Sequence, residues 1–226
     1  MHTSIRDVIR FLGRSTAALV CGLTLASCTS GEPEARSEQS CGISPSSQEG
    51  LLLRGILHAE TFETLLYSST REVAATLRHT LPETSPEKRT HQKSTCALWA
   101  AGQNGADRVT FSFGWVPRAS KEVDEQLSEG VPFEAEGGAF GQASATDTVL
   151  YVGCELPAEL GEPSKSAWLR ARASHNVSPP RTDIDQAVRD QQTALTYLMA
   201  RRITDALGCE NKPLEKPPVV KPLPTP

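Results

Sequence analysis

The chain of 226 residues carries 23 Lys and Arg against 27 Asp and Glu, which gives a formal net charge of −4 at pH 7. This acidic balance argues against nucleic acid as a partner and against a polybasic membrane patch, since both require clustered Lys or Arg. The length suits one domain with two tails.

Residues 1–27 have the three parts of an export signal. Arg6, Arg10 and Arg14 make the first part positive, and residues 15–25 are uncharged and mostly apolar. At about 11 residues this run is too short to cross a bilayer as a helix, which takes roughly 20. Removing the signal would leave 20 basic and 26 acidic residues, a net charge of −6.

The signal ends in Leu25-Ala26-Ser27-Cys28, which resembles the lipobox of bacterial lipoproteins. The resemblance implies that the Cys28 thiol takes a diacylglyceryl group and becomes the mature N-terminus. The two acyl chains of this group, such as palmitate, would anchor the protein stably, because one acyl chain alone gives only weak, reversible membrane binding. We therefore expect a lipid-anchored protein on the extracellular face of the cell membrane. The alternative is a plain secretory signal that happens to contain Cys28.

Four cysteines remain once Cys21 is discarded with the signal and Cys28 is lipidated: Cys41, Cys96, Cys154 and Cys209. An even set in an oxidising compartment indicates two disulfides. A zinc site is the competing interpretation, but there is no Cys-x-x-Cys pair and no His at ligand spacing. Of the three possible pairings we favour Cys41–Cys96 with Cys154–Cys209, because each ties a flanking segment to the nearest strand.

The first part of the mature chain predicts a tether followed by helices. Segment 28–50 has almost no large apolar residue, so it cannot offset the entropy of ordering and is expected to be flexible. Over 51–81 apolar residues recur mostly every three or four positions, which predicts helices. Ser68-Ser69-Thr70 interrupts the pattern, with Thr70 as the N-cap of a second helix, and Pro82 ends it.

Two hairpins are predicted next. Segments 94–101 and 108–116 alternate in polarity around an Asn-Gly turn, the strongest short hairpin signal. Segments 148–156 and 167–174 form a second pair of strands. Residues 119–130 are acidic and polar and predict at most a short helix.

The best predicted helix begins at Thr182 as N-cap, carries an apolar stripe and ends at Gly208 in the C′ position. The Pro-rich segment 212–226 is expected to be extended or disordered. The whole order predicts an α+β fold over 51–211: an antiparallel sheet of about four to five strands with helices on one face, held by two disulfides.

No motif for a nucleophile elbow, zinc protease, P-loop or dinucleotide site is present. The mature histidines, His58, His79, His91 and His175, are isolated from one another in sequence. A lone His is usually structural or solvated. We expect no cofactor and no metal.

Several motifs together resemble a group of uncharacterised secreted lipoproteins of actinomycetes, of the streptomycete type. They are Cys41-Gly42, the Ser-Thr-Cys-Ala-Leu-Trp strand at 94–99, the Gly-rich run before Cys154 and the terminal Leu207-Gly208-Cys209. The resemblance covers most of 41–209. It implies fold and location and assigns no catalytic residue.

The sequence therefore favours a non-enzymatic, lipid-anchored binding or adaptor protein of the bacterial cell envelope. Its partners would be the membrane, through Cys28, and a protein, peptide or envelope component. One alternative is a carrier of a small apolar ligand, in a pocket lined by Phe111, Phe113 and the final helix. Another is a hydrolase whose isolated His and carboxylates converge in one cleft.

Overall fold

The computed structural model describes residues 41–85, 88–103, 105, 107–120, 123, 130–176, 184–216, 218 and 220–222. These residues fall within one unit, Glu32–Pro226. The predicted signal, the lipidation site Cys28, the N-cap Thr182 and most of 119–130 lie outside the described residues.

The framework is one antiparallel sheet in the order β1-β2-β3-β7-β6-β5-β4-β8. Its strands are β1 (Phe62–Leu66), β2 (Lys93–Ala100), β3 (Arg108–Pro117), β4 (Val131–Ala135), β5 (Ala139–Ala143), β6 (Asp147–Val152), β7 (Ala167–Asn176) and the short β8 (Val220–Pro222). The antiparallel sheet is confirmed, but four to five strands were too few. The two predicted hairpin pairs, β2–β3 and β6–β7, are both present.

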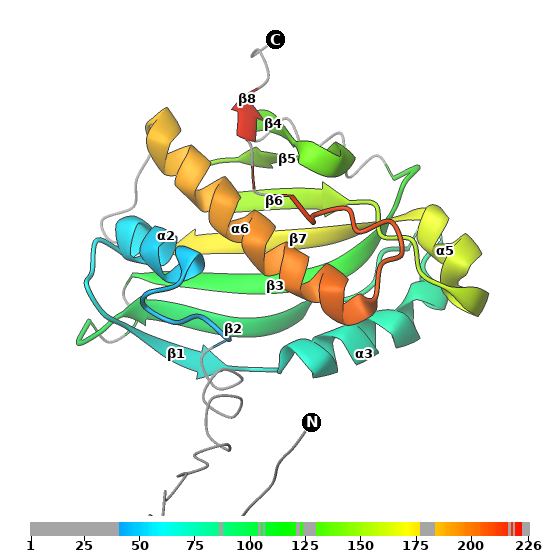
Figure 1. Ribbon diagram of the computed structural model, residues 1–226, viewed down its shortest axis with the longest axis horizontal. Coiled ribbons are helices and arrows are strands. Elements are labelled where there is room, and N and C mark those ends of the chain that lie inside the picture. Colours follow the sequence, from blue (N-terminus) through cyan, green and yellow to red (C-terminus); the bar gives the residue numbers. More distant parts are fainter. Residues whose placement is uncertain are drawn as a thin grey trace, which may run out of the picture. The chain divides into compact units, whose positions relative to one another are not determined.

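Helices cover one face of this sheet (Figure 1). They are α2 (Gln48–Leu57), α3 (Thr70–Thr80) and the long α6 (Gln186–Leu207). Short elements complete the connections: η1 (Leu81–Glu83), η2 (Glu136–Gly138), η3 (Ala158–Leu160) and α5 (Gly161–Lys165).

Sequence explains where α6 begins and ends. The Asp185 side chain accepts a hydrogen bond from the backbone N–H of Val188 at 2.8 Å, which satisfies one of the free donors of the first turn. At the other end Gly208 has φ +70°, a left-handed conformation that glycine adopts without a Cβ clash. The end of the helix is therefore as predicted, whereas its N-cap is Asp185 and not the predicted Thr182.

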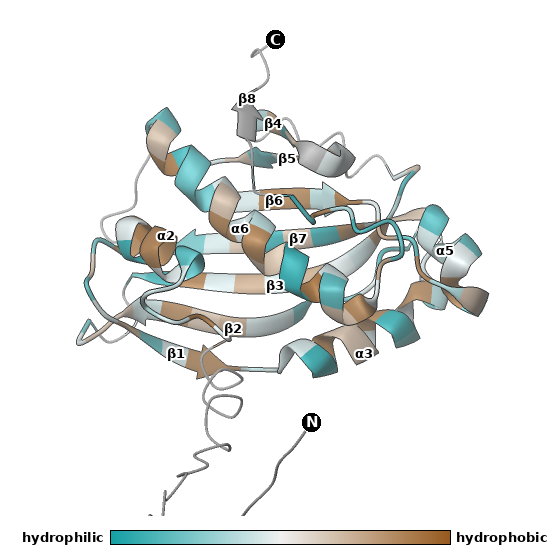
Figure 2. Cartoon of the chain, viewed as in Figure 1, coloured by the Kyte–Doolittle hydropathy of each residue, from teal (hydrophilic) through white to brown (hydrophobic). Residues whose placement is uncertain are grey.

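The core lies between α6, α3 and the helix-facing side chains of the central strands. Phe111, Phe113 and Trp115 alternate along β3 and are completely buried. The Trp115 indole N–H donates to the carbonyl of Leu77 on α3 at 2.8 Å, so burial leaves its polar atom satisfied. Figure 2 shows the apolar residues on the strands beneath the helices.

Residues 62–66 form a strand, so the prediction of helix there is wrong. Leu57, Phe62, Leu65 and Leu66 fit a helical spacing, but the chain pairs with β2 from Phe62↔Ala100 to Leu66↔Cys96. Cross-strand pairing overrides the weak local periodicity. The following helix begins one residue away from the expected position, with Ser69 as the N-cap in a capping box with Glu72.

Both domain boundaries lie further out than predicted. On the N-terminal side Cys41 and Ile43 are buried and α2 begins at Gln48, so residues 41–50 are part of the domain and not of a tether. On the C-terminal side Leu214 is buried and β8 pairs with β4, which contradicts a disordered segment from 212 onward. The hairpin β4–β5 was also missed; Gly137, at φ +82°, lies in its turn.

The structure contains the two disulfides in the favoured pairing, Cys41–Cys96 and Cys154–Cys209. The first joins the segment before α2 to β2, and the second joins the residue after Gly208 to the chain following β6. Each bond spans 55 residues of sequence. Closing loops of this length restricts the unfolded chain strongly.

Replacing both cysteines of one disulfide, as in Cys41→Ala/Cys96→Ala, should lower the free energy of unfolding by about 2–4 kcal/mol. Urea unfolding of the purified protein measures the change. Because the loops are equally long, Cys154→Ala/Cys209→Ala should give a similar loss. A loss below about 0.5 kcal/mol for both pairs would contradict this account.

Candidate functional site

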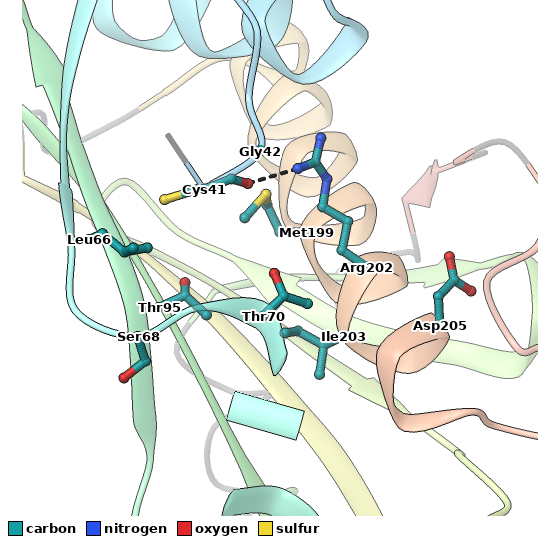
Figure 3. Close-up of a pocket in the computed structure, with 10 residues that line it drawn as sticks. All are labelled: Cys41, Gly42, Leu66, Ser68, Thr70, Thr95, Met199, Arg202, Ile203 and Asp205. Carbon is teal, nitrogen blue, oxygen red and sulfur yellow. Dashed lines mark hydrogen bonds between the residues drawn. The ribbon is translucent and has the colours of Figure 1, made fainter. Parts of the chain in front are cut away.

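A recess of about 360 Å³ opens where the N-terminal segment, the end of β1 and α6 meet (Figure 3). We call it the staple pocket, because Cys41 of the first disulfide forms part of its wall. Its lining residues are Cys41, Gly42, Leu66, Ser68, Thr70, Thr95, Met199, Arg202, Ile203 and Asp205. This volume is in the range of small-ligand pockets or of a recess for one side chain.

Arg202 of α6 fixes the upper wall of the staple pocket. Its Nη1 donates to the carbonyl of Cys41 at 2.7 Å, as Figure 3 shows, and its Nη2 donates to Oε1 of Glu49 at 2.8 Å. Burial raises the pKa of the Glu49 carboxyl, but hydrogen bonds from its own backbone and from Arg202 outweigh this and hold the pKa below its usual value. The charged pair therefore ties α2 and the Cys41 segment to α6.

The pocket is continuous with an exposed strand edge. Leu66, which lines it, is the last residue of β1, the outermost strand on that side of the sheet, and the lining residue Ser68 follows two positions later. Two of the three large apolar side chains that are exposed in the described chain, Leu65 and Tyr67, lie here, each 48% exposed. An apolar strand edge is unusual on a monomeric surface, where edges are commonly protected by charge or proline.

The histidines do not converge. His58 caps the end of α2, His79 lies on α3 and His91 precedes β2, all three exposed. His175 is 3% exposed on β7, where its Nε2 is 3.3 Å from the hydroxyl of Thr148. Burial lowers the pKa of His175 to about 4, and the nearby Asp147 carboxylate only partly opposes this.

The residues proposed to line an apolar carrier pocket are packed. Phe111 and Phe113 are fully buried in the core, so neither is accessible from solvent. Within the described residues no group of three or more His, Cys, Asp or Glu is placed to hold a metal ion. No helix in the same part of the chain is long and apolar enough to cross a membrane.

Comparisons with known proteins identified no relative of this chain. No family model matches the chain, and neither the curated proteins nor the solved structures contain a match. The resemblance to actinomycete lipoproteins thus stays a prediction.

The staple pocket and its strand edge were not identified from the sequence. The stretch 62–67 was interpreted as helix, although Phe62, Thr64 and Leu66 alternate with Glu63, Leu65 and Tyr67 in the period of a strand. That alternation is the signal in the sequence that indicates a strand, because Thr and aromatic residues are favoured in strands. No local sequence signal indicates the Arg202–Glu49 pair, because it joins residues 153 positions apart.

His175 makes stability depend on pH. Because its pKa is lowered on folding, the unfolded chain binds a proton between about pH 6.5 and 4 that the folded chain excludes, and stability falls as the pH drops. The free energy of unfolding should decrease by about 2 kcal/mol between pH 7 and pH 4.5 through this residue. His175→Gln should remove that part of the decrease in urea unfolding at the two pH values. An unchanged pH dependence in the variant would show that His175 is not its source.

Proposed function

We propose that the chain is a lipid-anchored, non-enzymatic binding protein of the cell envelope that takes an extended polypeptide segment along the edge of β1. The single observation that carries the proposal is the partly apolar outer edge of β1, which pairs with no other strand among the described residues and leads into the staple pocket. The two disulfides are consistent with an extracytoplasmic location.

The register of β1 defines which backbone groups face outward. Ala101 N–H donates to the carbonyl of Thr61 and Tyr67 N–H donates to the carbonyl of Thr95. In an antiparallel pair, bonding residues alternate with residues whose N–H and C=O point away. The N–H and C=O of Phe62, Thr64 and Leu66 therefore point outward. Within the described part of the chain they have no hydrogen-bond partner.

An added strand would bond to these groups, and the side chains beside them would give selectivity. Binding of this kind draws affinity from main-chain hydrogen bonds and specificity from contacts with alternate side chains. Leu65 and Tyr67 offer apolar contact on one side of the edge. At the end of the strand, the staple pocket offers Met199 and Ile203 beside the polar Arg202 and Asp205 for one side chain of the bound segment.

The carrier of a small apolar ligand remains the second candidate, because a recess of about 360 Å³ is large enough to hold one. It differs from the first in what it needs from the protein. A small ligand would use the staple pocket alone, whereas a peptide would also use the outward backbone groups of β1.

Thr64→Pro separates the two candidates. Proline removes the outward N–H of residue 64 and is tolerated on an edge strand where that N–H bonds to no neighbour. Peptides selected from a display library on the whole protein should bind Thr64→Pro about tenfold or more weakly, measured by fluorescence anisotropy.

The matched control is Thr64→Val, which keeps the N–H and the side-chain shape and should bind as the unchanged protein does. Equal thermal unfolding midpoints would show that both variants are folded. Peptide binding that is unaffected by Thr64→Pro, or a library that yields no binder while a small apolar molecule copurifies, would refute the peptide proposal.

The membrane anchor has its own test. In cells that make the protein, Cys28→Ala should move it from the membrane fraction to the medium, because the acyl chains have no thiol to join. Metabolic labelling with a fatty-acid analogue should tag the unchanged protein and not the variant. A variant that stays membrane-bound without label would contradict the anchor.

A further inference from the structure

The outer edge of β1 offers different side chains on the two faces of the sheet. Side chains along a strand alternate between its faces. Phe62 and Leu66 lie on the helix face, where both are half-buried and pack against the core. Glu63, Leu65 and Tyr67 lie on the other face, where all three are exposed. A strand added to this edge would therefore meet β1 side chains on both of its own faces.

The C-terminal end of this edge is apolar on both faces. Leu65 and Tyr67 are each 48% exposed, and Leu66 between them lines the staple pocket. A bound strand covers both faces only with consecutive apolar residues, the pattern typical of strands that are buried on both sides. A ligand with strictly alternating polarity would leave one of the two faces in contact with water.

Glu63 gives the N-terminal end of the edge a negative charge. Its carboxylate accepts from the indole N–H of Trp99 at 3.0 Å and from the backbone N–H of Gly102 at 3.4 Å. Both donors are neutral, and within the described residues Glu63 forms no ion pair with a Lys or Arg. Glu60, by contrast, lies 3.2 Å from Arg54. The charge of Glu63 is therefore available to a ligand.

The direction of the bound strand determines the order in which it meets these residues. Every pairing between strands of this sheet is antiparallel, and antiparallel pairs are slightly more stable per residue than parallel ones. Residues directly opposite each other in such a pair have their side chains on the same face. From its N-terminus, an antiparallel ligand would lie opposite Tyr67, Leu66, Leu65, Thr64 and Glu63 in turn.

We propose that the edge of β1 selects a peptide with three consecutive apolar residues, one intervening residue and then a lysine or arginine. The apolar residues lie opposite Tyr67, Leu66 and Leu65, and the basic residue lies opposite Glu63. Apolar pairs and pairs of opposite charge across strands are both stabilising. The net charge of −4 adds attraction for a basic ligand. This inference rests on the proposed peptide binding and adds the sequence and direction of the ligand.

The order of residues is tested with two labelled peptides of the same composition. One contains valine, leucine, isoleucine, threonine and lysine in this order between Gly-Ser flanks, and the other contains the five residues in reverse. Fluorescence anisotropy with the full chain should show the first peptide binding about threefold or more tightly than the second. A reversed peptide that binds equally well or better would overturn the proposed order and direction.

Glu63→Gln tests the charge, because the amide oxygen of glutamine can still accept from Trp99. The unchanged protein should bind the lysine peptide about threefold or more tightly than a peptide with glutamate in that position. Glu63→Gln should bring this ratio to about one, as should a high salt concentration. The matched control, Glu60→Gln, removes an exposed acid just before β1 and should leave the ratio unchanged. A ratio that Glu63→Gln leaves unchanged, or that both variants lower equally, would exclude Glu63 as the determinant.

Leu65→Ser tests the apolar contact on the exposed face. Loss of this contact should weaken binding of the first peptide about fivefold. The matched control is Leu51→Ser, because Leu51 is also an exposed leucine but lies on α2. It should leave binding unchanged. Equal losses in the two variants, or no loss in either, would contradict the proposed contact.

A failure of this selectivity is distinguishable from a failure of peptide binding itself. If Thr64→Pro weakens both peptides equally while Glu63→Gln and Leu65→Ser have no effect, the edge binds peptides without the proposed preference, and only this inference fails. If no peptide binds, both proposals fail. Unchanged thermal unfolding midpoints confirm that the variants are folded.

Discussion

Burial of α6 against the sheet is the contact on which the helix layer and both terminal segments of the described domain depend. The middle of this helix packs on β6 and β7, and it also contacts α2 and α3. Polar groups of α6 then bind the surrounding segments. Arg202 donates to the segment before α2. The last carbonyls of α6, at Ala206 and Leu207, accept from Arg78 of α3. The hydroxyl of Tyr197 donates to the carbonyl of Lys216 and fixes the C-terminal segment. Burial of the apolar stripe supplies most of the free energy that holds α6 on the sheet. The polar contacts fix how the neighbouring segments are oriented against the helix.

This arrangement gives the domain two different faces. The helix side contains the core and, at its rim, the staple pocket. The other side is not covered by α2, α3 or α6, but it carries a smaller buried apolar cluster of its own, formed by Val116, Val123, Val149 and Tyr151. Arg170, Arg172 and Ser174 lie on that side of β7, between core residues of the opposite face. The sheet thus separates the core under the helices from a smaller apolar cluster and a row of polar side chains on its other face.

Elements with a strong local signal were predictable, and elements made by distant partners were not. The alternation of Phe111, Phe113 and Trp115 and the Leu207-Gly208 ending each follow from a few neighbouring residues, and both are as expected. The strand β1 needs β2 as a partner, and β8 needs β4, so the local pattern of 62–66 and the prolines of 212–226 were misleading. The basic residues 88–93 were visible in the sequence, but only the fold brings Arg170 and Arg172 beside them.

The Cys41–Cys96 bond has a consequence beyond stability. Cys41 and Gly42 form a wall of the staple pocket, and the bond to β2 holds that wall in place together with one hydrogen bond from Arg202. In a reducing compartment the bond would not form, and the wall would depend on that hydrogen bond and on the burial of Ile43. Oxidation therefore adds a covalent support to this wall of the staple pocket. Under the proposed export, the pocket would reach its most rigid form only after the chain enters an oxidising compartment.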